Sequence, residues 1–138
     1  MKGRWDWDAI RAGGSVALVF AVPFSIAARW AADSRDDSVL AVWLSLGAVL
    51  GFVIGAGCAA WVQRTGTPLS HALVTAVGTY LAAQAVFALV RLVRGQDVRW
   101  FAIMFNLTVV LGGGLLGGLL GQKLRSRGVL PGSRGSST

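Results

Sequence analysis

Three long stretches of this chain, residues 39–62, 65–90 and 100–122, contain no charged residue. About 20 residues of α-helix cross the hydrocarbon core of a bilayer, so each stretch is long enough to span it. A soluble helix of this length carries a polar stripe on its exposed face, and these stretches do not. Charged residues make up 14% of the chain, against about 25% in soluble proteins. The pattern predicts an integral membrane protein in contact with the lipid bilayer.

A fourth, weaker apolar stretch precedes these three. We therefore predict an all-α fold of four transmembrane helices, and the short connections require neighbouring helices to run antiparallel in a bundle. The predicted spans are residues 12–32, 39–62, 69–90 and 98–122, between a polar N-terminal segment at 1–11 and a basic, disordered tail at 123–138. Thr67 and Asp97 are the predicted N-caps of the third and fourth spans, and Pro68 is placed at the first helical position.

The first span is weaker because Gly13, Gly14 and Pro23 lower its helix propensity, and Pro23 is expected to kink it. A cleaved signal peptide is the alternative interpretation, since the chain starts with basic residues and has small residues further on. Asp6 and Asp8 argue against cleavage, and so do the three further spans. We predict an uncleaved span.

The net charge of +7 raises the question of nucleic-acid binding. The Lys and Arg residues lie almost entirely at the ends of the apolar stretches, where membrane proteins keep positive charge, so we predict no nucleic-acid partner. Eight of the 13 lie on the side of the two termini and five on the opposite side. By the positive-inside rule, both termini are predicted to be cytoplasmic.

Glycine recurs at every fourth position in the second and fourth spans. Residues four apart share a helix face, so each series provides a flat strip on which another backbone can pack closely. The predicted helix-packing residues are Gly47, Gly51, Gly55, Gly113, Gly117 and Gly121. Internal packing of the bundle is the favoured interpretation, and contact with a second copy or a larger membrane complex is the alternative.

Four polar residues lie six or seven positions inside their own spans, measured from the side opposite the termini. They are Ser25, Ser45, Gln84 and Asn106. At 1.5 Å per residue they share one depth, about 10 Å below the membrane surface. An interhelical hydrogen bond between Gln84 and Asn106 is the favoured interpretation, because amides in lipid seek partners. The alternative is a polar vestibule for an ion or a small solute.

No catalytic, cofactor-binding or metal-binding residue is predicted. The chain has no Glu, and Cys58 and His71 are its only cysteine and histidine. A lone His without Asp, Glu, Cys or a second His near it is rarely a metal ligand or a general base. His71 is placed near a helix start, where it reaches water or headgroups, and Tyr80 is expected to bond a neighbour through its hydroxyl.

Residues 47–125 resemble a family of small, four-span bacterial membrane proteins of unknown function. The resemblance rests on AAWVQR (59–64), PLSHALVTAVGTY (68–80) and GGLLGQKLR (117–125). It implies a multi-pass protein of the bacterial plasma membrane and supplies no activity. We expect a non-enzymatic structural or accessory role through glycine-mediated helix packing. An oligomeric transporter or channel for an ion or small solute is the alternative.

Overall fold

The computed structural model describes residues 4–35, 38–129 and 131 of the chain. Within these residues it contains four α-helices and no strand: α1 (Trp7–Arg35), α2 (Ser38–Val62), α3 (Pro68–Val93) and α4 (Trp100–Ser126). Each is long and apolar enough to cross a membrane. The predicted all-α fold of four transmembrane helices is confirmed, and its apolar helices fit a lipid bilayer.

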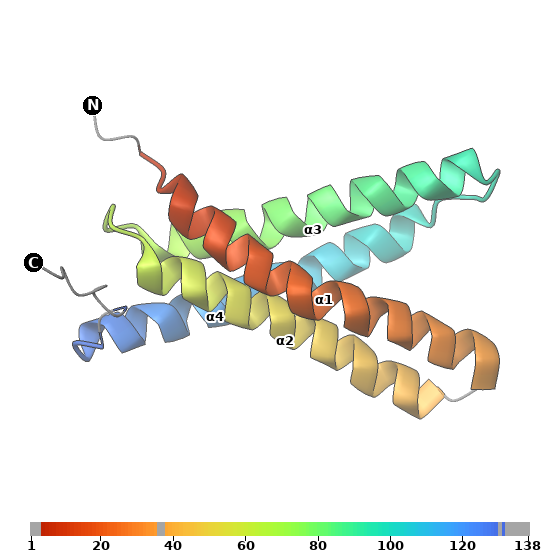
Figure 1. Ribbon diagram of the computed structural model, residues 1–138, viewed down its shortest axis with the longest axis horizontal. Helices are drawn as coiled ribbons and strands as arrows, with labels where there is room; N and C mark the ends of the chain where they lie inside the picture. The colour runs from red at the N-terminus through yellow and green to blue at the C-terminus, as the bar shows by residue number, and fades with distance from the viewer. Residues whose placement is uncertain (1–3, 36–37, 130, 132–138) are drawn as a thin grey trace, which may run out of the picture.

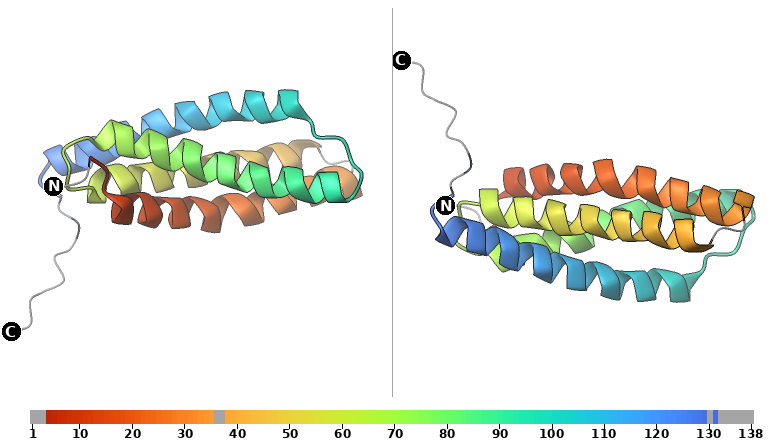
Figure 2. Two further views of the ribbon diagram at one scale, coloured as in Figure 1. Left: turned by 90° about the horizontal axis from the view of Figure 1, so that it is seen from above. Right: turned by 90° about the horizontal axis from the view of Figure 1, so that it is seen from below.

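Neighbouring helices run antiparallel as two hairpins, α1–α2 and α3–α4 (Figure 1). We call the end where α1 begins and α4 ends the terminal end, and the opposite end, where α1 ends and α4 begins, the loop end. The hairpins lie close together at the terminal end and diverge toward the loop end (Figure 1). Two further views show α1 and α2 side by side along their length (Figure 2).

Two helix boundaries differ from the prediction at the terminal end. α1 begins at Trp7 because Asp6 caps it, its Oδ1 accepting the Ala9 N–H at 3.2 Å. The helix continues through Pro23 as far as Arg35. α4 extends to Ser126, so the start of the predicted disordered tail is helical. Residues 130 and 132–138 of that tail lie outside the described residues.

The predicted caps of α3 and α4 are half right. Thr67 is the N-cap residue of α3 and Pro68 follows at the first position, but the Thr67 side chain bonds no helix N–H. Arg99 is the N-cap residue of α4, so the Asp97 cap was wrong. α4 starts at Trp100, two residues later than that cap requires, and the Asp97 carbonyl instead accepts a hydrogen bond from Arg91.

The glycines of α2 pack against α1. A Cβ added at Gly55 would lie 2.5 Å from the Gly13 carbonyl oxygen. One at Gly51 would lie 2.7 Å from the Phe20 Cβ. Gly47 faces the ring of Phe24 in the same way, at 2.7 Å. The whole α2 strip is therefore used inside the α1–α2 hairpin.

The glycines of α4 pack against two helices. A Cβ at Gly117 would collide with the Val53 carbonyl oxygen, one at Gly121 with the Gly57 carbonyl oxygen, and one at Gly113 would lie 3.3 Å from the Val53 side chain, so this strip faces α2. The parallel strip at Gly114 and Gly118 faces Ala76 and Ala72 of α3. All six predicted packing glycines thus lie at contacts within one chain.

The divergence of the hairpins follows from the sizes of the facing side chains. The contacts of the α4 glycines with α2 and α3 all lie in the terminal half of the bundle. Toward the loop end larger side chains replace them, and Phe52, Tyr80 and Val110 are buried where the hairpins last meet. Backbones that approach closely at one end and are held apart by aromatic rings at the other must form a wedge.

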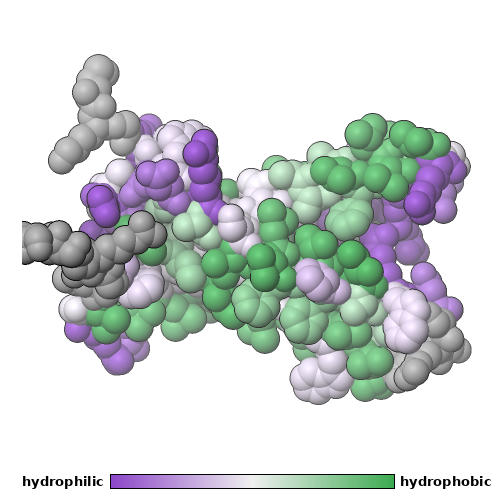
Figure 3. Space-filling view, viewed as in Figure 1, coloured by the Kyte–Doolittle hydropathy of each residue, from purple (hydrophilic) through white to green (hydrophobic). Residues whose placement is uncertain are grey.

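Hydrophilic residues gather at both ends of the molecule, and the visible middle is apolar (Figure 3). At the loop end they also occupy the notch between the two hairpins (Figure 3). An apolar belt between two polar ends is the surface expected of a protein that crosses a bilayer.

Candidate functional site

A cavity of about 390 Å³ lies between the hairpins in the loop-end half of the bundle, lined by residues of all four helices. We call it the vestibule. Its floor is made by Phe52, Tyr80 and Val110, which are 7%, 4% and 3% exposed. The Phe52 and Tyr80 rings meet nearly edge to face, with centroids 6.1 Å apart. The floor therefore separates the vestibule from the glycine-packed half.

All four residues of the predicted polar layer line the vestibule: Ser25, Ser45, Gln84 and Asn106. They come from α1, α2, α3 and α4 respectively, so the common depth inferred from the sequence corresponds to one shared cavity. The Ser45 hydroxyl is already bonded to the Ala41 carbonyl of its own helix at 2.8 Å.

The predicted hydrogen bond between Gln84 and Asn106 is wrong, since no such bond joins these two described residues. A hydrogen bond between α3 and α4 is made instead by Tyr80, whose hydroxyl donates to the Ile103 carbonyl at 2.8 Å. This confirms the bond expected of Tyr80. Gln84 and Asn106 both line the cavity.

Because the amides do not meet, we expect Gln84→Leu and Asn106→Leu to change the free energy of unfolding independently. The double variant should match the sum of the two single variants to within about 0.5 kcal/mol. Reversible unfolding in detergent measures this. A coupling above about 1 kcal/mol would mean that the amides do bond each other.

The mouth of the vestibule is a second, adjoining cavity of about 300 Å³. Arg29, Gln84 and Asn106 line both cavities, and Arg91 and Arg99 line only the mouth. Three arginines from different parts of the chain therefore meet at one opening. Sequence reasoning placed them on the same side of the membrane but did not bring them together.

The arginine positions are set by neighbouring groups. The guanidinium carbon of Arg29, on α1, lies 5.5 Å from the centroid of the Phe87 ring on α3. Arg91 Nη1 donates to the Asp97 carbonyl at 3.2 Å. The first contact directs Arg29 across the opening toward α3, and the second holds Arg91 at the side of the opening, beside the segment that precedes α4.

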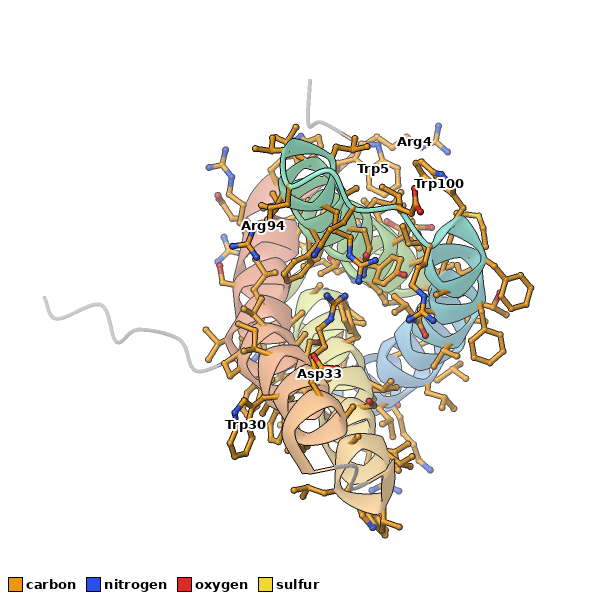
Figure 4. All side chains as sticks on the ribbon, turned by 90° about the vertical axis from the view of Figure 1, so that its right-hand side faces the viewer. Arg4, Trp5, Trp30, Asp33, Arg94 and Trp100 are labelled. Atoms are coloured by element: carbon orange, nitrogen blue, oxygen red, sulfur yellow. The ribbon has the colours of Figure 1, made fainter. Side chains whose placement is uncertain are left out.

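One acidic residue, Asp33, also lines the mouth. Seen from the loop end, Asp33 lies at the opening between the hairpins, whereas Arg94, Trp30 and Trp100 lie at the outside of the bundle (Figure 4). Three arginines and one aspartate leave the mouth with an excess of positive charge. A cavity of low dielectric concentrates such a field, so the opening attracts anions.

The terminal end is organised around His71. The prediction that His71 reaches water or headgroups was wrong, because the side chain is 0% exposed. Its Nδ1 lies 2.8 Å from the Thr67 carbonyl oxygen, which only accepts, and its Nε2 lies 2.9 Å from the Asp6 N–H, which only donates. These partners require a neutral ring protonated on Nδ1. The burial was not foreseen because it depends on residues before α1 folding back over α3.

Further hydrogen bonds hold together the segments that surround His71. Gln63 is 1% exposed, and its Oε1 accepts from the Thr65 N–H, the Thr65 hydroxyl and the Gly66 N–H. Asp6 Oδ2 accepts the Arg64 N–H at 3.0 Å. Arg125 donates to the Gln63 carbonyl. These bonds tie the start of α1, the α2–α3 turn and the end of α4 together, which is a structural role.

The described part of the chain offers no cluster of side chains that could bind a metal ion. Among the residues that the structure describes, no three His, Cys, Asp or Glu side chains gather at one place. Cys58 is a half-buried free thiol on α2. The vestibule and its mouth are therefore the candidate site, and what they offer is shape and charge for binding.

One packing feature was missed that the sequence does contain. Small residues recur at every fourth position of α1, at Ala9, Gly13, Ala17 and Ala21, and all four are buried. Gly13 lowers the helix propensity of α1, but it also lets α1 approach α2 closely, since a Cβ there would collide with the Gly55 carbonyl oxygen.

Comparisons with protein-family models, with curated proteins and with solved structures give no match for this chain.

Proposed function

We propose that this chain is a non-enzymatic, multi-pass membrane protein that holds a small ligand in the vestibule. One observation carries the proposal: polar residues from all four helices converge on a cavity of about 390 Å³, within the range of about 300–1,000 Å³ that is usual for ligand sites. The floor of Phe52, Tyr80 and Val110 ends the cavity on one side. This supports binding from the loop end rather than a continuous pore through the single chain.

Filling the vestibule should remove the ligand. Ala83 lines the cavity and Ala85, two residues along α3, is exposed and does not. After mild extraction, mass spectrometry of the intact protein should find a bound small molecule on the wild type and on Ala85→Trp. Ala83→Trp should lose it. Retention by Ala83→Trp, or a wild type that carries no ligand, would contradict the proposal.

An accessory role through helix contact with another membrane protein is the second candidate. The predicted glycine strips are occupied within the bundle, but Gly78 and Ala82, four residues apart on α3, are exposed, and a Cβ at Gly78 would meet nothing within 4 Å. Such a pair lets another helix approach closely. This role would take first place if the extracted wild type carried a second protein chain and no small molecule, and if Gly78→Leu released that second chain.

We further propose that the membrane is the bacterial plasma membrane and that both termini are cytoplasmic, so the vestibule opens outward. The excess of Lys and Arg on the side of the termini supports this orientation. Reporter fusions after residues 35, 66, 95 and 138 should lie outside, inside, outside and inside. The reversed order would mean that both termini lie outside. Two adjacent fusions on the same side would mean that the helix between them does not cross the membrane.

A further inference from the structure

The charges at the mouth of the vestibule suit an anionic headgroup. Arg29 is on α1, Arg91 on α3 and Arg99 immediately before α4, and all three line the mouth. A guanidinium group presents several N–H donors in a plane and binds phosphate or carboxylate oxygens in pairs. Only one acidic residue, Asp33, is among the lining residues, so most of this positive charge is available to a ligand.

The arginines are also oriented for such contact. Arg29 reaches from α1 to the Phe87 ring of α3, across the opening instead of away from it. Arg91 uses Nη1 on the Asp97 carbonyl, and a guanidinium has four further N–H donors. Arg94, three residues after Arg91, lies at the outside of the bundle and lines neither cavity (Figure 4). Basic residues at the loop end therefore differ in role, although all of them lie near the expected headgroup level.

Below the arginines the cavity is mostly apolar. Leu18, Val22 and Val109 line its walls, and Phe52 and Val110 lie at its floor. An apolar cavity of about 150 Å³ is large enough to hold benzene, so 390 Å³ accommodates a segment of alkyl chain. The polar groups of Gln84 and Asn106 lie where the two cavities join, between the charged mouth and the apolar interior.

We propose that the vestibule binds one anionic amphiphile, a lipid-like molecule with a phosphate or carboxylate headgroup. The headgroup lies among Arg29, Arg91 and Arg99, and the alkyl chain extends down to the aromatic floor. This proposal rests on the function proposed above, since it names the chemical class of the vestibule's ligand. Two other ligand classes fit less well: a free anion leaves the apolar cavity empty, and a neutral amphiphile leaves the excess positive charge of the mouth unbalanced.

Dodecyl phosphate is a suitable probe for the full-length protein in a neutral maltoside detergent at fixed micelle concentration. Titration calorimetry should show saturable binding of one molecule per chain. Arg29→Gln, Arg91→Gln and Arg99→Gln should each weaken binding by about fivefold, and the triple variant by about fiftyfold or more. Arg94→Gln is the matched control and should stay within about twofold of the wild type. Each variant keeps the buried core intact, and its unfolding temperature checks that it is folded.

Two comparison ligands separate the contribution of the headgroup to binding from that of the alkyl chain. Dodecanol, with the same chain and no charge, should bind at least about tenfold more weakly than dodecyl phosphate. Its affinity should be the same for the wild type and the arginine variants. Inorganic phosphate should show no saturable binding at millimolar concentration. Dodecanol binding as tightly as dodecyl phosphate would overturn the anionic class and leave the ligand-binding function standing. Phosphate binding that survives Ala83→Trp would overturn the amphiphile, since the site would be a surface anion site. If neither dodecyl compound bound, the amphiphile would be overturned, whereas the ligand-binding function would still be decided by the bound molecule that mass spectrometry finds on the wild type and not on Ala83→Trp.

Discussion

Replacing Gly117 by alanine is expected to destabilise the bundle by about 2 kcal/mol, as overpacked interiors usually do. The new Cβ would collide with the Val53 carbonyl oxygen and lie 3.0 Å from the Gly57 nitrogen. Both are backbone atoms, so no side chain can rotate away to make room. The α2 and α4 backbones would have to separate, and the contacts at Gly113 and Gly121 would weaken with them.

Gly112 provides the matched control, because it lies on the same helix and a Cβ there would meet nothing within 4 Å. Alanine is the better helix former by about 1 kcal/mol, so Gly112→Ala should leave stability unchanged or raise it slightly. Reversible unfolding in detergent measures both variants. Equal effects at the two positions would mean that the α4 strip makes no close contact with α2.

Replacing His71 by alanine is expected to cost about 3 kcal/mol of unfolding free energy. The side chain is fully buried and makes hydrogen bonds on both ring nitrogens. Its loss leaves a cavity and removes the acceptor of the Asp6 N–H. The Trp5 ring, 5.4 Å from the imidazole between centroids, would also lose its contact. The start of α1 should therefore loosen together with the fall in stability.

Amide hydrogen exchange can locate this effect. In His71→Ala, exchange should accelerate at Asp6 and at Arg64, whose N–H is bonded to the Asp6 carboxylate. Ser70→Ala, one residue earlier and exposed, should change stability by less than about 0.5 kcal/mol. A loss of stability without faster exchange at Asp6 would show that His71 matters only as packing volume.

The fold class followed from the sequence because it depends on a local property. A helix can cross lipid only if about 20 successive residues are apolar, and that requirement is visible in the chain itself. The common level of the four polar residues along the bundle followed for the same reason, since position along a helix converts directly into distance. Ser25 and Asn106, far apart in sequence, line the same cavity as that conversion suggests.

Helix ends were less predictable, because caps depend on backbone geometry that residue type alone does not decide. Asp6 caps α1 and Asp97 does not cap α4, although both are aspartates near the start of an apolar run. Thr67 precedes a helix as expected, yet its hydroxyl lies 3.1 Å from His71 Nδ1 and bonds no helix N–H.

The sequence by itself determined that the chain forms four membrane-length helices, which faces carry glycine, and that the polar residues share one level along the bundle. Only the tertiary structure decided which helices those faces meet and where the bundle opens. Glycine spacing shows that some backbone can approach, but Gly117 meets Val53 only because the two hairpins cross at that point. Likewise, Arg29, Arg91 and Arg99 share a mouth because aromatic side chains hold the hairpins apart beside them. Such an opening is a property of how whole helices fit together, and no short stretch of sequence encodes it.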